Sequence, residues 1–426
     1  MELVKKYLNK KGVDFDFDIV ATSEWDIFAN IAYDSIHHCN EEYKETITRD
    51  EKIKYLSNFT HSLSGKEPID NNKLLSLEEE IIDKLFVSYK RNNNLGSIVN
   101  VNGKELIRKT KDKRVDLITY SFPCQDLSVA GSIHGFNKGM EEGSETRSSL
   151  LWQIGRILDE LNSISKLPRF LLLENVKNML SKKHLPQYEK WISKLKGLGY
   201  STKTFIIDAK DYGVPQHRER VFAVSILNYN GKTNEKGEIL DINNFDLKGD
   251  ILKNKTLLDI IQEDYHIPKI RWEAELAWAN DTPSRQKMFN RNFVLNSNLD
   301  DAKKYSRTVT TRQDRFPNAG VVDLKNAINK GMIRQYRLHS NPYFETKIYR
   351  KKKSNFRLIT PREAYMLMGF EYEDFDNVYY RNFNKNYKPI FRREKLYQQA
   401  GNSIVINAIT PIMNLIGEFW CNEKNR

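Results

Sequence analysis

The feature that most constrains the fold is an alternation of short apolar runs with amphipathic segments through the first half of the chain. The runs at 115–122, 169–176, 201–209 and 218–227 each contain a short apolar core, and apolar residues at helical spacing fill 148–164. Continuous apolar strands crossed by helices are typical of a parallel sheet that is covered on both faces. We therefore predict an α/β fold with a doubly wound, mostly parallel sheet.

Changes in this pattern predict the domain boundaries. Residues 1–228 form a predicted catalytic and cofactor-binding domain, with a charged, helix-leaning insert at about 40–95. The alternation is lost in the polar, basic stretch 229–355, which indicates a second, irregular domain. Regular patterning returns in 356–426, and we expect its final apolar helix to pack back on the first domain.

Composition narrows the class of protein. The formal net charge of +12 over 426 residues suits a polyanionic partner, although a generally lysine-rich proteome would produce it equally. Cys39, Cys124 and Cys421 are too few and too scattered for a disulfide framework, and no second cluster joins "HHCN" to complete a metal site. We expect a soluble, cytoplasmic protein with no metal and no membrane span.

Reactive and charged residues follow or flank the apolar runs, where ligands bind in an open α/β sheet. Cys124 follows a proline at the exit of one run, Glu174 ends the next, and Arg218 and Arg220 open the last. Singly, each has a plainer reading as a buried thiol, a helix-terminal carboxylate or a surface charge. Together they suit nucleophilic attack on an electron-poor ring that an acid protonates and cations hold.

Five ordered segments resemble the DNA (cytosine-5)-methyltransferase family of bacterial restriction-modification systems. They are "SFPCQDLS", "LLLENVKNML", "DYGVPQHRERVF", "RLITPREAYMLMGF" and "QAGNSIVINAI". One such segment would be weak evidence, but five in the family's order cover most of the chain. The resemblance implies transfer of a methyl group from S-adenosylmethionine to carbon 5 of a cytosine flipped from a specific double-stranded DNA sequence.

The resemblance also implies catalytic roles. Cys124 supplies a thiolate that adds to carbon 6 of the base and forms a covalent adduct. Glu174, partly protonated, hydrogen-bonds the ring nitrogen, while Arg218 and Arg220 hold the flipped base and the adjacent backbone, and Gln216 orders their loop.

For the cofactor, the resemblance places Glu24 on the ribose hydroxyls and Trp25 on the adenine face. The cofactor-binding residues expected are Glu24, Trp25, Ser97, Pro123, Leu150, Asn402 and Ser403. Ser97 stands where the family commonly has an acidic residue, so a weaker polar contact is expected there. The residues expected to contact DNA are Gln125, Ser128, Gln216, Arg307, Thr308, Thr310, Arg312 and Arg315.

Double-stranded DNA and a functionally linked restriction endonuclease are the expected partners of a monomeric chain. Three alternatives stay open at this point. An RNA (tRNA) cytosine-5 methyltransferase would have a reduced recognition region, a catalytically silent DNA-binding relative need not keep the thiol and carboxylate, and a cysteine hydrolase would need a histidine base.

One part of the family pattern is missing. The family opens with a β-strand and a Phe-x-Gly-x-Gly turn at the cofactor, and "MELVKKYLNKKGVDFDFDIVATSEW" contains neither. We therefore expect the first strand to be missing and the chain to begin in the following helix, with Leu3 and Leu8 facing the core. The second strand is expected by about Asp18, and cofactor binding and activity are expected to be weak.

Overall fold

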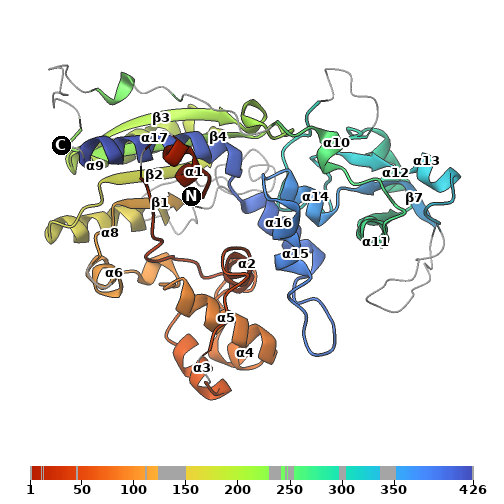
Figure 1. The fold of residues 1–426 in the computed structure, drawn as a ribbon, viewed down its shortest axis with the longest axis horizontal. Helices are drawn as coiled ribbons and strands as arrows, with labels where there is room; N and C mark the ends of the chain where they lie inside the picture. Colours follow the sequence, from red (N-terminus) through yellow and green to blue (C-terminus); the bar gives the residue numbers. More distant parts are fainter. Residues whose placement is uncertain are drawn as a thin grey trace.

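The structure is a computed structural model that describes most of the chain. The described residues are 2–10, 12, 14–44, 47–110, 113–122, 150–229, 241–244, 247, 254–296, 304–335 and 352–424. They form a central sheet with helices on both faces, a helical insert to one side of it, and a second, smaller sheet at the far end (Figure 1).

The central sheet has the strand order β1-β2-β4-β3. Its strands are β1 (Leu117–Ser121), β2 (Phe170–Val176), β3 (Tyr200–Asp208) and β4 (Glu219–Leu227). β1 runs parallel to β2, whereas β4 is antiparallel to both β2 and β3. The α/β class is confirmed, and the described sheet is mixed, because β1, β2 and β3 run in one direction and β4 is reversed. Only residues 209–218 join β3 to β4, which is too short for the crossover that a parallel pair requires.

Two terminal helices cover one face of this sheet. α1 (Glu2–Lys10) packs along α17 (Ile406–Lys424), and both share a buried cluster with Phe170 and other inward residues of β2 and β4. Leu8 is fully buried, as expected, and a Cβ added at Gly417 would lie 2.5 Å from its Cδ1. The side chain of Leu3 lies outside the described residues. The final helix therefore returns to the first domain, as its apolar pattern predicts.

The opposite face of the sheet is covered by α8 (Leu151–Ser163) and α9 (Leu185–Gly197). Leu171 and Leu173 of β2, which alternate with the residues of the other face, pack here around the fully buried Trp191. Because neighbouring side chains of a strand point to opposite faces, a continuous apolar run is what a sheet between two helical layers requires.

The second strand, expected by about Asp18, does not form. Thr22 makes only an isolated parallel bridge to Asn94. Side chains satisfy the backbone instead, since Asn93 Nδ2 donates to the Val20 carbonyl at 2.9 Å and Glu24 N donates to Asn94 Oδ1 at 3.1 Å. The expected second strand is therefore wrong, and among the described residues no strand precedes β1.

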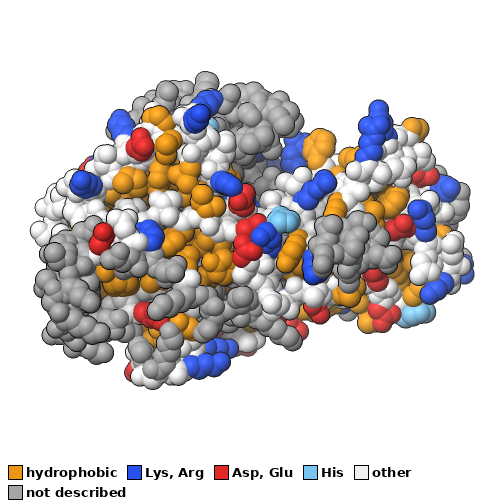
Figure 2. Space-filling model, turned by 90° about the horizontal axis from the view of Figure 1, so that it is seen from above, with side chains coloured by type: hydrophobic (Ala, Val, Ile, Leu, Met, Phe, Trp, Pro, Cys, Tyr) orange, Lys and Arg blue, Asp and Glu red, His pale blue; other side chains and the backbone are white. Residues whose placement is uncertain are grey.

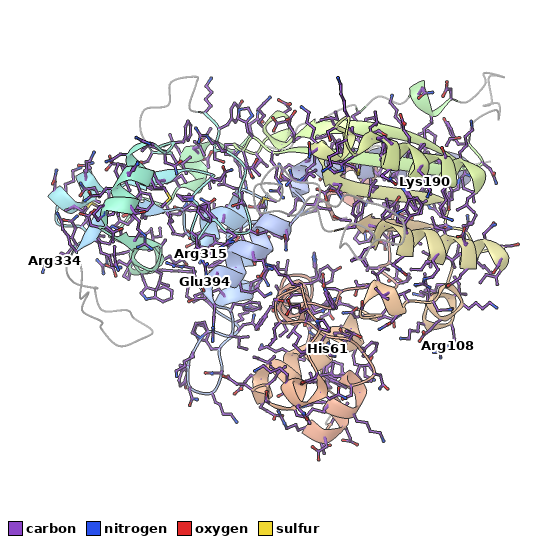
Figure 3. All side chains as sticks on the ribbon, turned by 180° about the vertical axis from the view of Figure 1, so that it is seen from behind. His61, Arg108, Lys190, Arg315, Arg334 and Glu394 are labelled. Atoms are coloured by element: carbon purple, nitrogen blue, oxygen red, sulfur yellow. The ribbon has the colours of Figure 1, made fainter. Side chains whose placement is uncertain are left out.

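The insert at about 40–95 is helical, as expected. The helices in and around it are α2 (Ile27–His37), α3 (Arg49–Leu56), α4 (Asn71–Leu75), α5 (Glu79–Arg91), η1 (Ile98–Asn100) and α6 (Gly103–Lys109). His61 lies at the centre of this insert, where its Nδ1 meets Tyr89 OH at 3.2 Å (Figure 3).

The smaller sheet is antiparallel, with the order β5-β7-β6. It consists of β5 (Trp278–Asn280), β6 (Val321–Asp323) and β7 (Lys353–Leu358), and its helices are α10 (Leu257–Ile260), α11 (Pro268–Leu276), α12 (Pro283–Asn290) and α13 (Lys325–Asn329). β7 crosses the predicted boundary between 355 and 356, so the start of the closing region forms part of this sheet.

The closing helices lie between the two sheets (Figure 1). They are α14 (Pro361–Met366), α15 (Tyr372–Tyr379) and α16 (Arg393–Asn402), and short helices η3 (Lys177–Leu180), η4 (Ala209–Tyr212) and η5 (Ile242–Asn244) complete the described elements. Buried ion pairs attach the small sheet to them, because Arg357 of β7 pairs with Glu363 of α14 at 2.8 Å and Arg362 pairs with Glu273 of α11 at 2.7 Å.

One helical stretch of the described chain, Arg393–Trp420, is long and apolar enough by composition to cross a membrane. Half of its most apolar window is buried inside the protein, and α17 within it packs on α1 and the central sheet. A core helix of a water-soluble protein passes the same test, so this stretch is weak evidence for a membrane span.

Candidate active site

Glu174 lies near the end of β2 and is almost completely buried, with 7% of its surface exposed. Ser121 Oγ, at the end of β1, donates a hydrogen bond to Glu174 Oε2 at 3.1 Å, and Arg220 Nε lies 3.2 Å from Oε1. Burial raises the pKa of Glu174, while the charges of Arg220 and Arg218 act in the opposite direction. A buried carboxyl with a raised pKa is suited to general acid–base chemistry.

The end of β1 is tied to the same place. Asn175 Nδ2 donates to the carbonyl oxygen of Phe122 at 3.2 Å, directly beyond Ser121. The predicted nucleophile Cys124, together with Pro123, Gln125 and Ser128, lies outside the described residues. The chain is thus attached beside Glu174 two residues before the expected nucleophile.

Arg218 does not lie on an open surface. It is 3% exposed, and its backbone N donates to Asp208 Oδ1 at 2.9 Å. Its Nη1 donates to the carbonyl of Val309 at 2.9 Å, and its Nη2 donates to the carbonyls of Gly401 and Ser403 at 2.9 and 3.0 Å. The expected grip on a flipped base does not suit terminal nitrogens that already bind three backbone carbonyls.

Gln216 is fully buried and is engaged at both ends of its amide. Val309 N donates to Gln216 Oε1 at 2.8 Å, and Gln216 Nε2 donates to the Leu367 carbonyl at 2.6 Å. These bonds suit the expected role in ordering the loop. A direct DNA contact does not suit a side chain with no exposed surface.

The expected recognition threonines lie directly beside this loop. Thr308 Oγ1 donates to the His217 carbonyl at 2.7 Å, and an isolated parallel bridge pairs Gln216 with Ser306. Thr310 is half-buried and accepts a bond from Gln313 N at its carbonyl, 3.3 Å away. The segment 306–310 therefore runs alongside the strand entry that carries Arg218 and Arg220.

The expected recognition arginines are exposed; they are Arg307, Arg312 and Arg315. Arg315 lies toward the small-sheet end of the molecule in Figure 3. Lysine and arginine side chains are spread over both parts of the face shown in Figure 2, with acidic side chains among them. Charge alone therefore does not mark a DNA-binding path. The segment 306–310 is located instead by its contacts with the loop that leads to Arg218.

The expected cofactor residues Glu24 and Trp25 come just before α2. Their backbone is held in place by Asn94, whose Oδ1 accepts from Glu24 N and whose Nδ2 donates to the Glu24 carbonyl at 3.0 Å. Glu24 Oε1 accepts from the backbone N of Asp26 at 2.7 Å, and burial raises the pKa of Glu24 to about 7. A carboxylate and an indole at this position fit the ribose and purine of a nucleoside ligand.

The structure brings the other expected cofactor segments to this point. Gly96, adjacent to Ser97, accepts a hydrogen bond from Ser23 Oγ at 2.8 Å. The turn of Asn402 and Ser403 is linked through α16, where Ser403 Oγ donates to Gln399 O at 2.8 Å and Gln399 Nε2 donates to the carbonyl of Phe28 at 2.9 Å. Leu150, by contrast, is partly buried against the core cluster under α8.

Several residues at the site were missed from the sequence. Asp208 ends β3 and binds Arg218, so the strand-end rule that selected Glu174 would also have found it. Lys395 Nζ donates to Asp26 Oδ2 at 2.7 Å and holds α16 against the cofactor segment. A Cβ added at Gly401 would lie 2.3 Å from Thr311 N, which only a glycine avoids without displacing backbone.

Comparison with known proteins identifies the family to which this chain belongs. The chain is 30% identical over 426 residues to the orphan methyltransferase M.SssI of Spiroplasma monobiae, covering 97% of this chain and 94% of that protein. It is 31% identical over 392 residues to the type II methyltransferase M2.ScrFI of Lactococcus lactis subsp. cremoris, covering 91% and 89%.

A solved structure of the Entamoeba histolytica methyltransferase EhMeth shares the fold, with a TM-score of 0.50 at 15% identity over 94% of this chain and 99% of that one. The family model for C-5 cytosine-specific DNA methylases matches residues 53–418, which include Glu174, Arg220 and the closing turn. The chain therefore belongs to the C-5 cytosine-specific DNA methylase family, whose members are DNA (cytosine-5)-methyltransferases.

Proposed function

We propose that this chain methylates carbon 5 of a cytosine that is flipped from a specific double-stranded DNA sequence, through a covalent adduct with Cys124. One observation carries the proposal, namely that the end of β1, from which Cys124 follows, is bonded to a buried carboxyl that is itself paired with Arg220. The chain thus leads toward the proposed nucleophile from a point that is bonded beside the proposed proton donor and its paired cation.

The reaction follows from the chemistry of these groups. The Cys124 thiolate forms a bond to carbon 6 of the base while Glu174 gives a proton to the ring nitrogen, which makes carbon 5 nucleophilic. After carbon 5 is methylated, its hydrogen leaves as a proton to water, the bond between sulfur and carbon 6 breaks to restore the aromatic ring, and the ring nitrogen returns its proton to Glu174. Arg220, paired with Glu174, keeps the carboxyl oriented through both steps.

S-adenosylmethionine is the methyl donor that we propose for this reaction. Glu24, Trp25, Ser97 and the turn of Asn402 and Ser403 would hold it, since a carboxylate, an indole and backbone polar groups suit its ribose and adenine. The bound cofactor supplies an electrophilic methyl group. Because Ser97 stands where the family commonly has an acidic residue, Glu24 is the carboxylate among these expected cofactor residues.

We assign the choice of target sequence to residues 229–355 and the adjoining end of β7. The exposed Arg307, Arg312 and Arg315 and the segment of Thr308 and Thr310 lie there, and arginine can read guanine edges or hold phosphates. A functional link to a restriction endonuclease rests on the type II names of relatives such as M2.ScrFI. Cytoplasm is the compartment that this proposal implies.

The proposal is tested by methylation and adduct formation together. Bisulfite sequencing of DNA from cells that express the chain should reveal methylated cytosines in one sequence, and none with Cys124→Ala. Duplex DNA carrying 5-fluorocytosine should trap a denaturant-stable complex, because fluorine cannot leave as the proton does. A chain that methylates DNA without forming this adduct, or a Cys124→Ala variant that forms it, would contradict the proposed mechanism.

A further inference from the structure

Arg218 joins two segments that lie far apart in the sequence. Its Nη1 binds Val309, which is 91 residues away, and its Nη2 binds Gly401 and Ser403, which are 183 and 185 residues away. The first segment carries the expected recognition threonines, and the second is the expected cofactor-binding turn. We call the segment 308–311 the recognition segment and 401–403 the cofactor turn.

Replacing the hydrogen bonds of Arg218 with bonds to water would require a large displacement of the surrounding chain. The guanidinium is 3% exposed, and hydrogen bonds from a charged donor are roughly twice as strong as neutral ones. Because the fork of an arginine is planar and rigid, its two terminal nitrogens cannot shift independently. A displacement of the cofactor turn must therefore move the recognition segment or break bonds to a buried cation.

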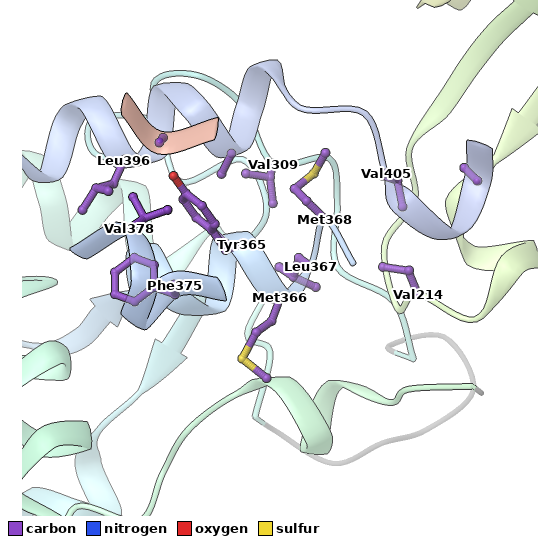
Figure 4. Close-up of a cluster of buried hydrophobic side chains, with 14 of the residues drawn as sticks. Val214, Val309, Tyr365, Met366, Leu367, Met368, Phe375, Val378, Leu396 and Val405 are labelled. Carbon is purple, nitrogen blue, oxygen red and sulfur yellow. The ribbon is translucent and has the colours of Figure 1, made fainter. Parts of the chain in front are cut away.

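The two segments also touch directly. A Cβ at Gly401 would lie 2.3 Å from Thr311 N and 2.5 Å from the carbonyl carbon of Thr310, so the backbones are in contact. Beside this contact, Val309, Leu367, Met368 and Val405 belong to one buried cluster (Figure 4). Close-packed interiors transmit displacement rather than absorb it.

Gln216 reinforces the same connection from the other side. Its amide accepts from Val309 N and donates to the carbonyl of Leu367. Val309 of the recognition segment is thus held by Gln216 at its N–H group and by Arg218 at its C=O group. The segment is thereby fixed to the loop that leads into β4, where Arg220 pairs with Glu174. A single rigid unit thus includes parts of the expected catalytic, cofactor and recognition sites.

We propose that Arg218 is a positioning residue that couples the cofactor turn to the recognition segment, so that an occupied cofactor site strengthens binding of the target DNA sequence. This inference rests on the proposed function. By thermodynamic linkage, target DNA must strengthen cofactor binding by the same factor. DNA without the target sequence does not engage the recognition segment and is bound equally with or without cofactor.

The test measures this coupling in the full chain. Fluorescence anisotropy gives the dissociation constant of a duplex carrying the sequence identified by bisulfite sequencing, with and without saturating S-adenosylhomocysteine, which cannot donate a methyl group. We expect the wild type to bind the target duplex at least about fivefold more tightly with this ligand, in the usual range of allosteric coupling. A duplex of equal length that lacks the target should show a ratio near one.

Arg218→Lys keeps the charge but loses the fork, so we expect its coupling ratio to fall toward one. Arg220→Lys is the matched control, because it makes the same change two residues away in a side chain that pairs with Glu174 instead. It should lower the methylation rate and keep the wild-type ratio. If Arg218→Lys does not fold, Gly401→Ala provides the second variant, since it pushes the turn from the recognition segment without altering Arg218.

The outcomes separate this inference from the proposed function. Three results overturn the inference alone. The wild-type chain methylates DNA but shows no coupling, or a folded Arg218→Lys or Gly401→Ala variant keeps the full coupling ratio. In the third, Arg220→Lys lowers the coupling ratio as much as Arg218→Lys does. A wild-type chain that binds and methylates no DNA overturns the proposed function and the inference with it.

Discussion

The attachment of the small sheet depends on the buried pair of Arg357 and Glu363, and its loss should be measurable. Both side chains are fully buried, and two parallel bonds of 2.8 Å join guanidinium to carboxylate. Glu363 also accepts from the backbone N of Gln262 at 2.8 Å and of Thr360 at 2.7 Å. Glu363→Gln would leave a buried guanidinium without its counter-charge.

Breaking a buried ion pair by changing one partner costs about 3–5 kcal/mol, because the remaining charge is desolvated without compensation. We expect Glu363→Gln and Arg357→Met each to lower the free energy of unfolding by an amount in that range. The double variant buries no unpaired charge, so it should be more stable than the sum of the single changes predicts, by about 2 kcal/mol.

Urea unfolding followed by tryptophan fluorescence measures these values, because Trp278 lies in β5, which pairs with β7. Hydrogen exchange of the β7 amides reports local opening of the same strand. As a control, Glu394→Gln removes an exposed carboxylate that lies 3.9 Å from Arg393 and should change stability by less than about 0.5 kcal/mol. Single variants that cost under about 1 kcal/mol, or a double variant equal to their sum, would refute the reasoning.

Three further predictions concern the site itself. Glu174→Gln cannot donate an acidic proton, so the single-turnover methylation rate should fall about 10²- to 10⁴-fold while DNA affinity stays within a few-fold, and an unchanged rate would remove Glu174 from the chemistry. Burial raises the pKa of Glu24 to about 7, so calorimetry should find S-adenosylhomocysteine affinity falling up to about tenfold per pH unit below that value, a dependence absent in Glu24→Gln. Stability changes in the opposite direction, since the contribution of Glu24 is fully present below its ordinary pKa of 4.5 and is lost as the pH rises through about 7. Arg315→Gln should reduce the slope of log affinity against log salt by about 0.9 if it binds a phosphate, whereas a change in the methylated sequence at an unchanged slope would assign it to a base.

The parts of the fold that could be predicted from the sequence depend on hydrophobic period. β1, β2 and their flanking helices α8 and α9 follow directly from continuous apolar runs and helical spacing. The direction of β4 could not be read in this way, because a buried strand has the same apolar pattern whether its neighbour is parallel or antiparallel. Only the short 209–218 connection contains that information.

The part of the candidate site that could be predicted consists of residues whose expected roles follow from their own side chains. Glu174 and Arg220 lie together as their order implies, with 3.2 Å between them. The partners of Arg218 could not be predicted, because they are backbone carbonyls at positions 309, 401 and 403, which no side-chain pattern identifies. The predicted strand before Trp25 failed for a similar reason, since asparagine side chains replaced the neighbouring strand that a β-pattern presupposes.

The clamp around Val309 grips main chain rather than side chains. Gln216 and Arg218 bind the N–H and C=O groups of Val309, and their other partners are carbonyls of Leu367, Gly401 and Ser403. Every amino acid except proline carries both groups, so exposed positions such as Arg312 and Arg315 can be replaced without loosening the attachment. Substitutions at such exposed positions can therefore change the DNA sequence that is recognised while the catalytic residues stay in place. This condition permits rapid divergence of specificity.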